Sequence, residues 1–242
     1  KLNILPNITD QNKGDPIFET NLFGKNIDNP IGMAAGFDKN AEVYNSLFKL
    51  GFGFVEVGTV TPLEQYGNPK PRVFRLVEDQ ALINRLGFNN LGADNVSNRI
   101  KSNSNKGLLG VNIGPNKDSE DRLNDYLIGL RNFYDIADYI TVNISSPNTP
   151  NLRELHGKSV ITPFLENLIK ASQTCAKKHN IEMVPLLLKI SPDENYKSLE
   201  HIVCSARDIG FSGVIATNTS VSRLKASTLE TFENGGLSGN PI

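Results

Sequence analysis

A surplus of small polar side chains follows one apolar segment of the sequence, ITVNISSPNTPNLR at residues 140–153. Apolar and polar residues alternate from Ile140 to Ser145, as in a β-strand, and the run Ser-Pro-Asn-Thr-Pro then ends the alternation. A turn alone needs one or two residues of this kind. The remaining amides and hydroxyls predict a polar pocket where the strand ends.

Carboxamides recur at the ends of the other predicted strands or in the loops above them. They are Asn84, Asn112, Asn143, Asn148 and Asn218. A carboxamide offers a donor and an acceptor side by side, which matches the imide or amide edge of a pyrimidinedione or a flavin, whereas phosphate or carboxylate recognition would call for Arg. Because Asn also caps helices and forms turns, a structural role is an equal alternative for any one of them.

Two lysines, Lys39 and Lys189, lie among these strand ends. Lys189 interrupts the apolar run LLLKIS, where burial is costly unless the ammonium group meets an anion or a reactive group. A functional lysine is therefore predicted at position 189, with a structural ion pair as the alternative.

The proton-transfer candidates are Ser145 and Ser146, by elimination. No His or Cys lies at the predicted mouth of the pocket, and Asp38 and Asp193 each lie beside a predicted helix start, where Asp acts as a cap. Strand alternation places Asn143 and Ser145 on one face. Ser146 follows in the loop and can aim its hydroxyl back over the pocket.

Six short apolar segments predict the strands that would position these side chains. They cover residues 30–36, 54–60, 108–114, 139–145, 185–191 and 213–219. Helical patterns separate most of them, including residues 41–48 and a helix with Thr162 as N-cap and Pro163 at its first position. Strands of this kind alternating with amphipathic helices indicate a parallel sheet covered by helices.

Every predicted strand ends in polar residues, which favours a (β/α)8 TIM barrel, in which the chemistry lies at the carboxyl ends of all strands. The alternative, an open doubly wound sheet, would favour a Gly-rich fingerprint after the first strand, and GFDKN is not one. A closed barrel needs eight strands, so residues 1–242 are expected to form one barrel domain that is incomplete after its sixth strand. The segments RVFRLV and QALINR predict an added hairpin that holds Asn84 above the pocket.

The composition narrows the class of protein. The 242 residues carry a formal net charge of −1 with no long run of one sign, so nucleic acid is not expected as a partner. No stretch of eighteen apolar residues occurs, so no transmembrane helix is predicted. Two cysteines and three histidines without ligand spacing predict no metal site.

The sequence contains, in this order, the segments GMAAGFDKN, FVEVGTVTP, GNPKPRVFRL, INRLGFNN, GVNIGPNK, VNISSPNTPNLRELHGK, LLLKISPD, GVIATNTS and GGLSG. Together these segments resemble the dihydroorotate dehydrogenase family, specifically its quinone-dependent class 2. The spelling SSPN indicates class 2, because class 1 members have Cys at the position of Ser146. The resemblance implies an FMN-binding barrel. It also implies oxidation of dihydroorotate to orotate in pyrimidine biosynthesis, with FMN as hydride acceptor and a quinone as final electron acceptor.

The resemblance also implies roles for individual residues. Ser146 would be the base that removes the C5 proton of dihydroorotate. The implied substrate shell is Lys39, Asn84, Arg85, Leu86, Gly87, Phe88, Asn143, Asn148, Asn218 and Thr219. The implied FMN contacts are Ala35, Gly36, Phe37, Asp38, Lys39, Thr59, Asn112, Asn143, Lys189, Thr217 and Gly239.

A location and an oligomeric state follow from the same resemblance. The protein would be a monomer on the cytoplasmic face of a bacterial inner membrane, or alternatively on the mitochondrial inner membrane. Both the N-terminal helical pair that makes this membrane contact and the family's FMN phosphate loops, after strands seven and eight, are expected to be absent from this chain. Pro115 departs from the Lys that many members have there.

Two other functions remain open at this point. A Schiff-base lyase or aldolase on the same barrel would use Lys189 as its nucleophile, although it leaves the carboxamides without a role. A partial barrel without activity of its own is the non-enzymatic alternative, because an open barrel exposes sheet edges.

Overall fold

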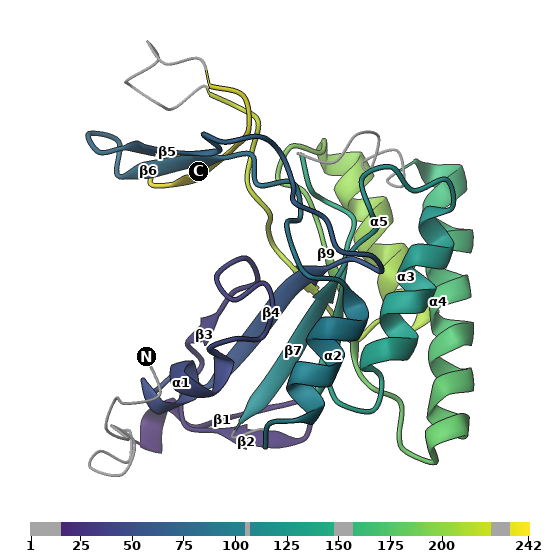
Figure 1. The fold of residues 1–242 in the computed structure, drawn as a ribbon. Coiled ribbons are helices and arrows are strands. Elements are labelled where there is room, and N and C mark those ends of the chain that lie inside the picture. The colour runs from purple at the N-terminus through teal and green to yellow at the C-terminus, as the bar shows by residue number, and fades with distance from the viewer. Residues whose placement is uncertain (1–15, 105–106, 148–156, 224–232) are drawn as a thin grey trace.

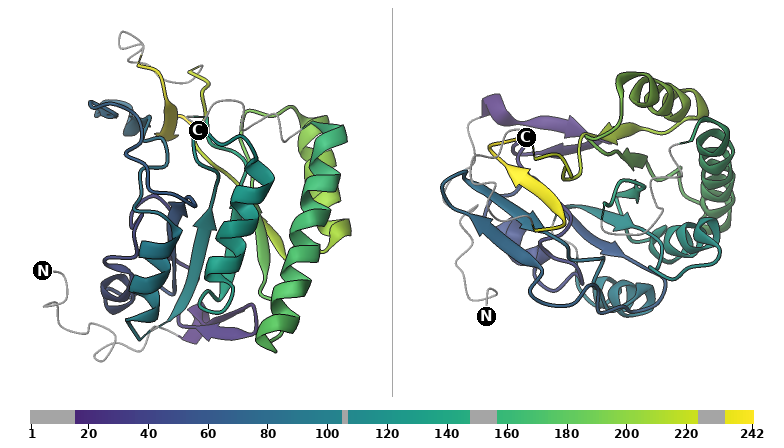
Figure 2. Two further views of the ribbon diagram at one scale, coloured as in Figure 1. Left: turned by 45° about the vertical axis from the view of Figure 1, so that its right-hand side comes forward. Right: turned by 90° about the horizontal axis from the view of Figure 1, so that it is seen from above.

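A six-stranded parallel sheet forms the centre of the protein, in the spatial order β10-β9-β8-β7-β4-β3. The computed structural model describes residues 16–104, 107–147, 157–223 and 233–242. The strands of this sheet are β3 (Gly32–Met33), β4 (Phe54–Val60), β7 (Leu108–Ile113), β8 (Tyr139–Asn143), β9 (Leu186–Lys189) and β10 (Gly213–Ile215). Seen from above, the sheet curls, with its helices on the convex side (Figure 2).

Five α-helices are present in the described residues. They are α1 (Tyr44–Lys49), α2 (Ala93–Lys101), α3 (Arg122–Phe133), α4 (Lys158–His179) and α5 (Tyr196–Ile209). Each lies between two consecutive strands of the parallel sheet or just before the next one, with the long α4 and α5 side by side (Figure 1). This alternation of strands and helices is the predicted parallel arrangement.

The core lies between the sheet and the helices. Every residue of β7 and β8 is buried, because these central strands have the helices on one side and the interior of the curl on the other. Aromatic side chains such as Tyr126, Phe133 and Tyr134 fill the helix side and are fully buried. Polar side chains are buried on the inner side, where Glu56, Asn112 and Thr141 lie.

A second, antiparallel sheet covers the carboxyl ends of the parallel strands (Figure 1). It consists of β5 (Val73–Leu76), β6 (Ala81–Asn84) and β11 (Gly236–Gly239), in the order β11-β6-β5. The predicted hairpin is therefore confirmed as β5 and β6. The pairing of β11 with β6 was not predicted. A small hairpin, β1 (Thr20–Leu22) with β2 (Lys25–Ile27), and a 3-10 turn at Pro16–Phe18 were not predicted either.

The predicted start of α4 is wrong. The helix begins at Lys158 with Gly157 as N-cap, so Pro163 lies inside the helix instead of at its first position. Pro163 is the sixth residue of this helix, so one helical hydrogen bond is missing there, because proline has no N–H to donate to the carbonyl four residues earlier. The fully buried Ile161 and Leu165 then hold the extra turn against the core.

The outer strands are shorter than predicted. β3 spans Gly32–Met33 instead of 30–36, and β10 spans Gly213–Ile215 instead of 213–219. The residues that follow these short strands leave the ladder, and several of them line a cavity. The loss of regular pairing at these ends is the local basis of the site.

Gly110 on β7 provides a test of the sheet packing. A Cβ atom at this position would lie 2.1 Å from Cζ of Tyr139, its neighbour on β8. Gly110→Ala is therefore expected to lower the free energy of unfolding by roughly 1–3 kcal/mol through overpacking. Urea unfolding of the full chain measures it.

The matched control is Gly213→Ala on β10, where the nearest atom is the flexible Leu187 Cδ2 at 3.2 Å. An equal loss of stability in both variants would contradict the packing explanation.

Candidate functional site

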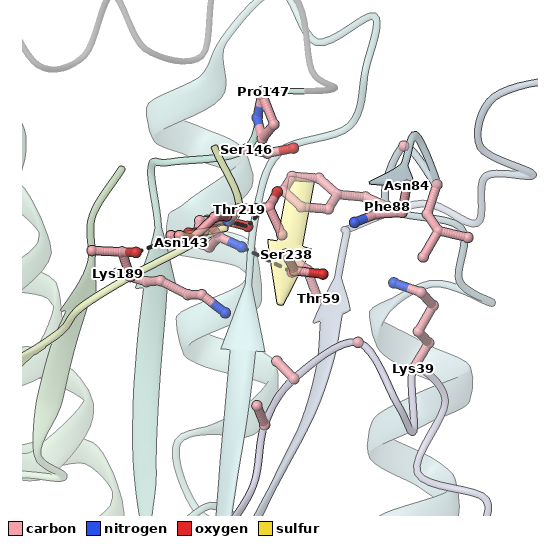
Figure 3. Close-up of a pocket in the computed structure, with 18 of the residues that line it drawn as sticks. Lys39, Thr59, Asn84, Phe88, Asn143, Ser146, Pro147, Lys189, Thr219 and Ser238 are labelled. Carbon is pink, nitrogen blue, oxygen red and sulfur yellow. Dashed lines mark hydrogen bonds between the residues drawn. The ribbon is translucent and has the colours of Figure 1, made fainter. Parts of the chain in front are cut away.

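A cavity of about 570 Å³ lies between the carboxyl ends of the parallel strands and the antiparallel sheet (Figure 3). Its walls come from at least seven separate segments of the chain, which only the fold brings together. The lining residues are Ala34, Ala35, Gly36, Lys39, Thr59, Asn84, Leu86, Gly87, Phe88, Asn143, Ser146, Pro147, Lys189, Thr217, Asn218, Thr219, Ser238, Gly239 and Ile242.

Most of the predicted site residues line this cavity, and four described ones do not. Asn112 is fully buried beneath the floor, and Phe37 is 62% exposed. Arg85 faces away: its guanidinium pairs with Glu233 and lies 4.6 Å from the centre of the Phe74 ring. Asp38 holds backbone groups, as described below. Asn148 lies outside the described residues.

Two lysines enter the cavity from opposite sides (Figure 3). Burial, together with the positive charges of Arg72 and Lys189, lowers the pKa of Lys39 to about 8. Burial also lowers the pKa of Lys189, and the Glu56 carboxylate opposes that shift. Two largely buried ammonium groups therefore give the cavity positive charge, which suits an anion.

A chain of hydrogen bonds connects the amides of the cavity floor. Asn143 donates through Nδ2 to Thr59 Oγ1 at 3.1 Å and to Asn112 Oδ1 at 3.3 Å. Thr59 Oγ1 donates to the same Asn112 oxygen at 2.6 Å. On its other side, Asn143 Oδ1 accepts from Ser145 Oγ at 2.9 Å and from Asn218 Nδ2 at 3.5 Å.

Below this chain lies the buried carboxylate of Glu56, which the sequence prediction did not include. Its Oε1 accepts from Asn112 Nδ2 at 2.8 Å, and its Oε2 accepts from Thr141 Oγ1 at 2.8 Å. Burial and the nearby Glu56 charge raise the pKa of Tyr139, which also hydrogen-bonds to this carboxylate. Both carboxylate oxygens are therefore satisfied within the interior.

The two serines have different surroundings. Ser145 is fully buried, and its hydroxyl binds Asn143 and accepts from Asn218 Nδ2 at 3.0 Å. Ser146 lines the cavity, above Asn143 (Figure 3). The hydroxyl of Ser145 thus belongs to the amide chain, whereas Ser146 is the serine beside the space for a ligand.

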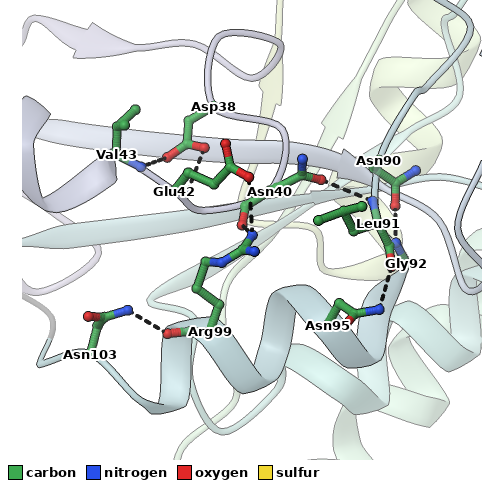
Figure 4. Close-up of polar contacts among 10 residues, drawn as sticks. All are labelled: Asp38, Asn40, Glu42, Val43, Asn90, Leu91, Gly92, Asn95, Arg99 and Asn103. Carbon is green, nitrogen blue, oxygen red and sulfur yellow. Dashed lines mark hydrogen bonds and ion pairs between the residues drawn. The ribbon is translucent and has the colours of Figure 1, made fainter. Parts of the chain in front are cut away.

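The two aspartates both hold backbone groups. Asp38 accepts from the backbone N–H groups of Glu42 and Val43, each at 2.8 Å, ahead of α1 (Figure 4). Asp193 is not the cap predicted for α5, because its carboxylate instead binds Ser220 Oγ and the backbone N–H of Val221.

Asn195 is the cap of α5 instead. Its side chain accepts from Ser198 N. Asp193 therefore anchors the loop after β10, next to Asn218 and Thr219.

Sequence reasoning missed four lining residues: Ala34, Pro147, Ser238 and Ile242. Ser238 lies on β11, whose four residues are too short to show any periodicity. A signal for Glu56 was present, since a carboxylate inside the apolar run FVEVGTV is as costly to bury as Lys189 is in LLLKIS.

The arrangement suits a planar heterocyclic ligand that carries negative charge. Carboxamides and hydroxyls line one wall, two lysines supply positive charge, and the small residues Ala35 and Gly36 leave room for a ring. Among the helices that the structure describes, none is both long and apolar enough to cross a membrane.

The arrangement of strands and helices has close counterparts among solved structures. A crystal structure of DHODH from Eimeria tenella in complex with ferulenol matches with a TM-score of 0.89 and 37% identity, covering 98% of this chain and 69% of that chain. The ligand-free type DHODH from the same organism matches with a TM-score of 0.86. The fold is thus that of an α/β TIM barrel, as predicted.

The sequence comparisons agree with the structural ones. A family model for dihydroorotate dehydrogenase matches residues 17–242. A protein of Bartonella tribocorum named dihydroorotate dehydrogenase (quinone) is 48% identical over 229 residues, and a protein of Rhizobium meliloti with the same name is 50% identical over 230 residues. Each alignment covers 94% of this chain and 63% of the relative.

The chain belongs to the dihydroorotate dehydrogenase family. The resemblance to its quinone-dependent members is confirmed, and the family in general depends on a flavin. The chain spans a little under two thirds of the length of the curated relatives it matches.

Asp38→Ala tests whether this side chain supports the backbone. Because it leaves two partly buried N–H groups without acceptors, the change is expected to lower the free energy of unfolding by about 1–3 kcal/mol. Folded protein should keep its flavin content, since the carboxylate does not line the cavity. Denaturant unfolding and flavin absorbance of the full-length protein measure both.

The matched control is Asp121→Ala. Asp121 is the N-cap of α3, and its side chain accepts a hydrogen bond from the backbone N–H of Asn124. Loss of flavin without loss of stability in Asp38→Ala would contradict the structural role.

Proposed function

We propose that this chain contributes the catalytic cavity of a quinone-dependent dihydroorotate dehydrogenase. The enzyme would oxidise dihydroorotate to orotate in pyrimidine biosynthesis, with FMN as hydride acceptor and a quinone as final electron acceptor. The observation that carries the proposal is a single cavity in which two lysines, a chain of carboxamides and Ser146 surround one space. The names of the relatives support the reaction and the quinone.

The lining of the cavity fits the isoalloxazine ring of a flavin. A volume of about 570 Å³ lies within the usual range for a cofactor site. Ala35 and Gly36 on one wall allow a ring to approach the backbone, while Asn143 and Lys189 offer polar groups for its pyrimidine edge. A bound FMN would accept the hydride from dihydroorotate, and a nearby ammonium group such as that of Lys189 would favour the negative charge of the reduced ring.

The positive charge at Lys39 fits the carboxylate of dihydroorotate. The pKa of Lys39 is lowered because its ammonium group is buried next to other cations. A bound carboxylate would compensate this charge, so binding energy is gained where the free protein has an unfavourable arrangement. Asn84 and Asn218 lie on the same cavity and supply amides for the ring of the substrate.

Ser146 is the proposed base that removes the C5 proton. Of the adjacent Ser145 and Ser146, it is the one that lines the cavity, and it lies near the amides that would orient the substrate ring. Because an unassisted hydroxyl is a weak base, the proton must pass onward through a water molecule or a neighbouring hydroxyl.

A Schiff-base reaction at Lys189 is favoured by one observation, the lowered pKa of that lysine. The Glu56 carboxylate opposes that lowering, however, and the carboxamide wall would have no role in such a reaction. The flavin reaction uses both features and is the one we retain.

The remaining assignments are also part of the proposal. We infer a monomeric protein bound peripherally to the cytoplasmic face of a bacterial inner membrane, since several of the most similar relatives come from bacteria and are named for a quinone. Residues 1–242 would belong to a single barrel domain.

Ser146→Ala tests the proposed base. In the full-length protein it should slow flavin reduction by dihydroorotate by roughly 10²–10⁴-fold and leave FMN binding nearly unchanged. Anaerobic stopped-flow absorbance measures the rate.

Ser145→Ala, at the adjacent position, is the comparison. Its hydroxyl belongs to the amide chain, so this variant should weaken ligand binding more than it slows reduction. If flavin reduction is slow in Ser145→Ala and unimpaired in Ser146→Ala, the base is Ser145 and the assignment to Ser146 is wrong.

Lys39 should make orotate binding depend on pH. Only the protonated lysine attracts the carboxylate. The affinity for orotate should therefore be constant well below the lysine pKa of about 8 and should fall as the pH rises through this value. At higher pH the fall should approach tenfold per pH unit. Titration of the flavin spectrum with orotate at a series of pH values measures the dissociation constant. Lys39→Met should bind weakly with a flat profile, and a wild-type profile that is flat up to about pH 10 would contradict the assignment.

A further inference from the structure

We infer that Gln65 and Asn90 are positioning residues whose amides hold the backbone at Gly87 and Phe88, and thereby hold the Phe88 ring in the wall of the ligand cavity. The inference deepens the proposed function and rests on it only for the identity of the ligand. The positions of the four residues follow from their contacts in the structure.

Phe88 has a backbone conformation that a residue with a large side chain rarely adopts. Its φ is 51°, in the left-handed region, and Gly87 directly before it has a φ of 71°. Glycine tolerates this region because it has no Cβ atom, whereas phenylalanine is strained there. Such a conformation persists only where the surrounding structure imposes it.

The ring of Phe88 forms part of the cavity wall. The side chain is 7% exposed and lines the cavity (Figure 3). Behind it lies Gly114, the residue after β7, where an added Cβ atom would lie 3.0 Å from Phe88 Cε2 and 2.8 Å from Thr59 Cγ2. Because the ring is packed between this glycine and the ligand space, a change in the Phe88 backbone would move the wall.

The carbonyl groups of the two left-handed residues accept hydrogen bonds from carboxamide side chains. Gln65 Nε2 donates to Gly87 O at 3.0 Å, and Asn90 Nδ2 donates to Phe88 O at 2.8 Å. Among the residues that the structure describes, no other group donates to either carbonyl. The two amides therefore determine where these carbonyls point.

The direction of each amide is set by backbone N–H groups, which can only donate. Gln65 Oε1 accepts from Lys117 N at 3.0 Å. Asn90 Oδ1 accepts from Gly92 N at 2.8 Å and from Thr61 N at 3.2 Å (Figure 4). With both oxygens engaged in this way, both NH₂ groups must face the carbonyls of the left-handed residues.

The two positioning residues also hold each other. The backbone N–H of Gln65 donates to Asn90 O, and the backbone N–H of Asn90 donates to Gln65 O, each at 3.0 Å. The loop after β4 and the segment after β6 are thus joined directly behind the cavity wall.

The test removes each donor and keeps the acceptor beside it. In Asn90→Asp the carboxylate still accepts from the same two N–H groups but places its second oxygen against the Phe88 carbonyl. Gln65→Glu makes the same change against Gly87, at a partly buried position, so it decides the question even if the buried Asn90→Asp fails to fold. Measurements at about pH 8.5, well above the ordinary pKa of a carboxyl group, keep both new groups ionised.

The first measurement needs no ligand. Para-fluorophenylalanine is placed at position 88 of the full-length protein, where its fluorine lies on the axis of ring rotation, so ring flips do not change its signal. We expect one ¹⁹F signal with the natural Gln65 and Asn90, and a shifted or split signal in Asn90→Asp and in Gln65→Glu. An unchanged signal in either folded variant would overturn the inference.

The matched control is Asn29→Asp, at the amino ends of β3 and β4. Asn29 makes the same pattern of bonds, since its Nδ2 donates to Gly51 O at 2.8 Å and its Oδ1 accepts from Ile31 N at 2.9 Å. It does not line the cavity. This variant should lose stability and keep the ¹⁹F signal unchanged, so an equal shift here would contradict a specific role of the two amides.

Ligand binding connects the wall to the proposed function. Asn90→Asp and Gln65→Glu should each weaken orotate binding about tenfold at equal flavin content and equal pH, while Asn29→Asp should bind as the wild type does. Wild-type affinity in both variants would overturn the role of the wall in binding. Orotate that fails to bind the wild type would contradict the proposed function, while the ligand-free ¹⁹F spectra would still decide the role of Gln65 and Asn90.

Discussion

The parallel alignment of the six central strands is the constraint on which the site depends. Because all of them run in one direction, their carboxyl ends meet at one rim, and side chains far apart in the sequence become neighbours. The register completes the arrangement, since it places Asn143 opposite Lys189 and Gly58 opposite Asn112. A slip of one residue on any of these strands would turn the polar side chains toward the helices.

Inside the curled parallel sheet, negative and positive charges lie at different levels. The Glu56 carboxylate lies below the amide chain, and the ammonium groups of Lys39 and Lys189 lie around the cavity above it. The two ammonium groups give the cavity a positive charge that suits an anionic ligand, while the hydrogen-bonded floor holds its side chains in place. Polar groups thus take the interior space that apolar layers fill in many barrels.

The sequence predicted the features that depend on local pattern. The bounds of β4 match the predicted residues 54–60, and the polar strand ends indicated where the cavity would lie. β11 could not be found in this way, because its four residues become a strand only through pairing with distant β6. For Glu56 the apolar run around it was a signal of burial, but its partners, Asn112 on β7 and Thr141 on β8, could be known only from the structure. Alternation correctly joined Asn143 to Ser145, but only the structure showed that this contact takes Ser145 out of the cavity.

The antiparallel sheet above the cavity pairs residues that are very far apart in the chain. Gly236 lies opposite Asn84, and Leu237 lies opposite Ile83. Pairings of such high sequence separation form late, because a long loop must close before they contribute stability. During synthesis, the ribosome must therefore release residues beyond 236 before the cavity acquires its cover, so a nascent chain that already contains both lysines cannot yet enclose a ligand.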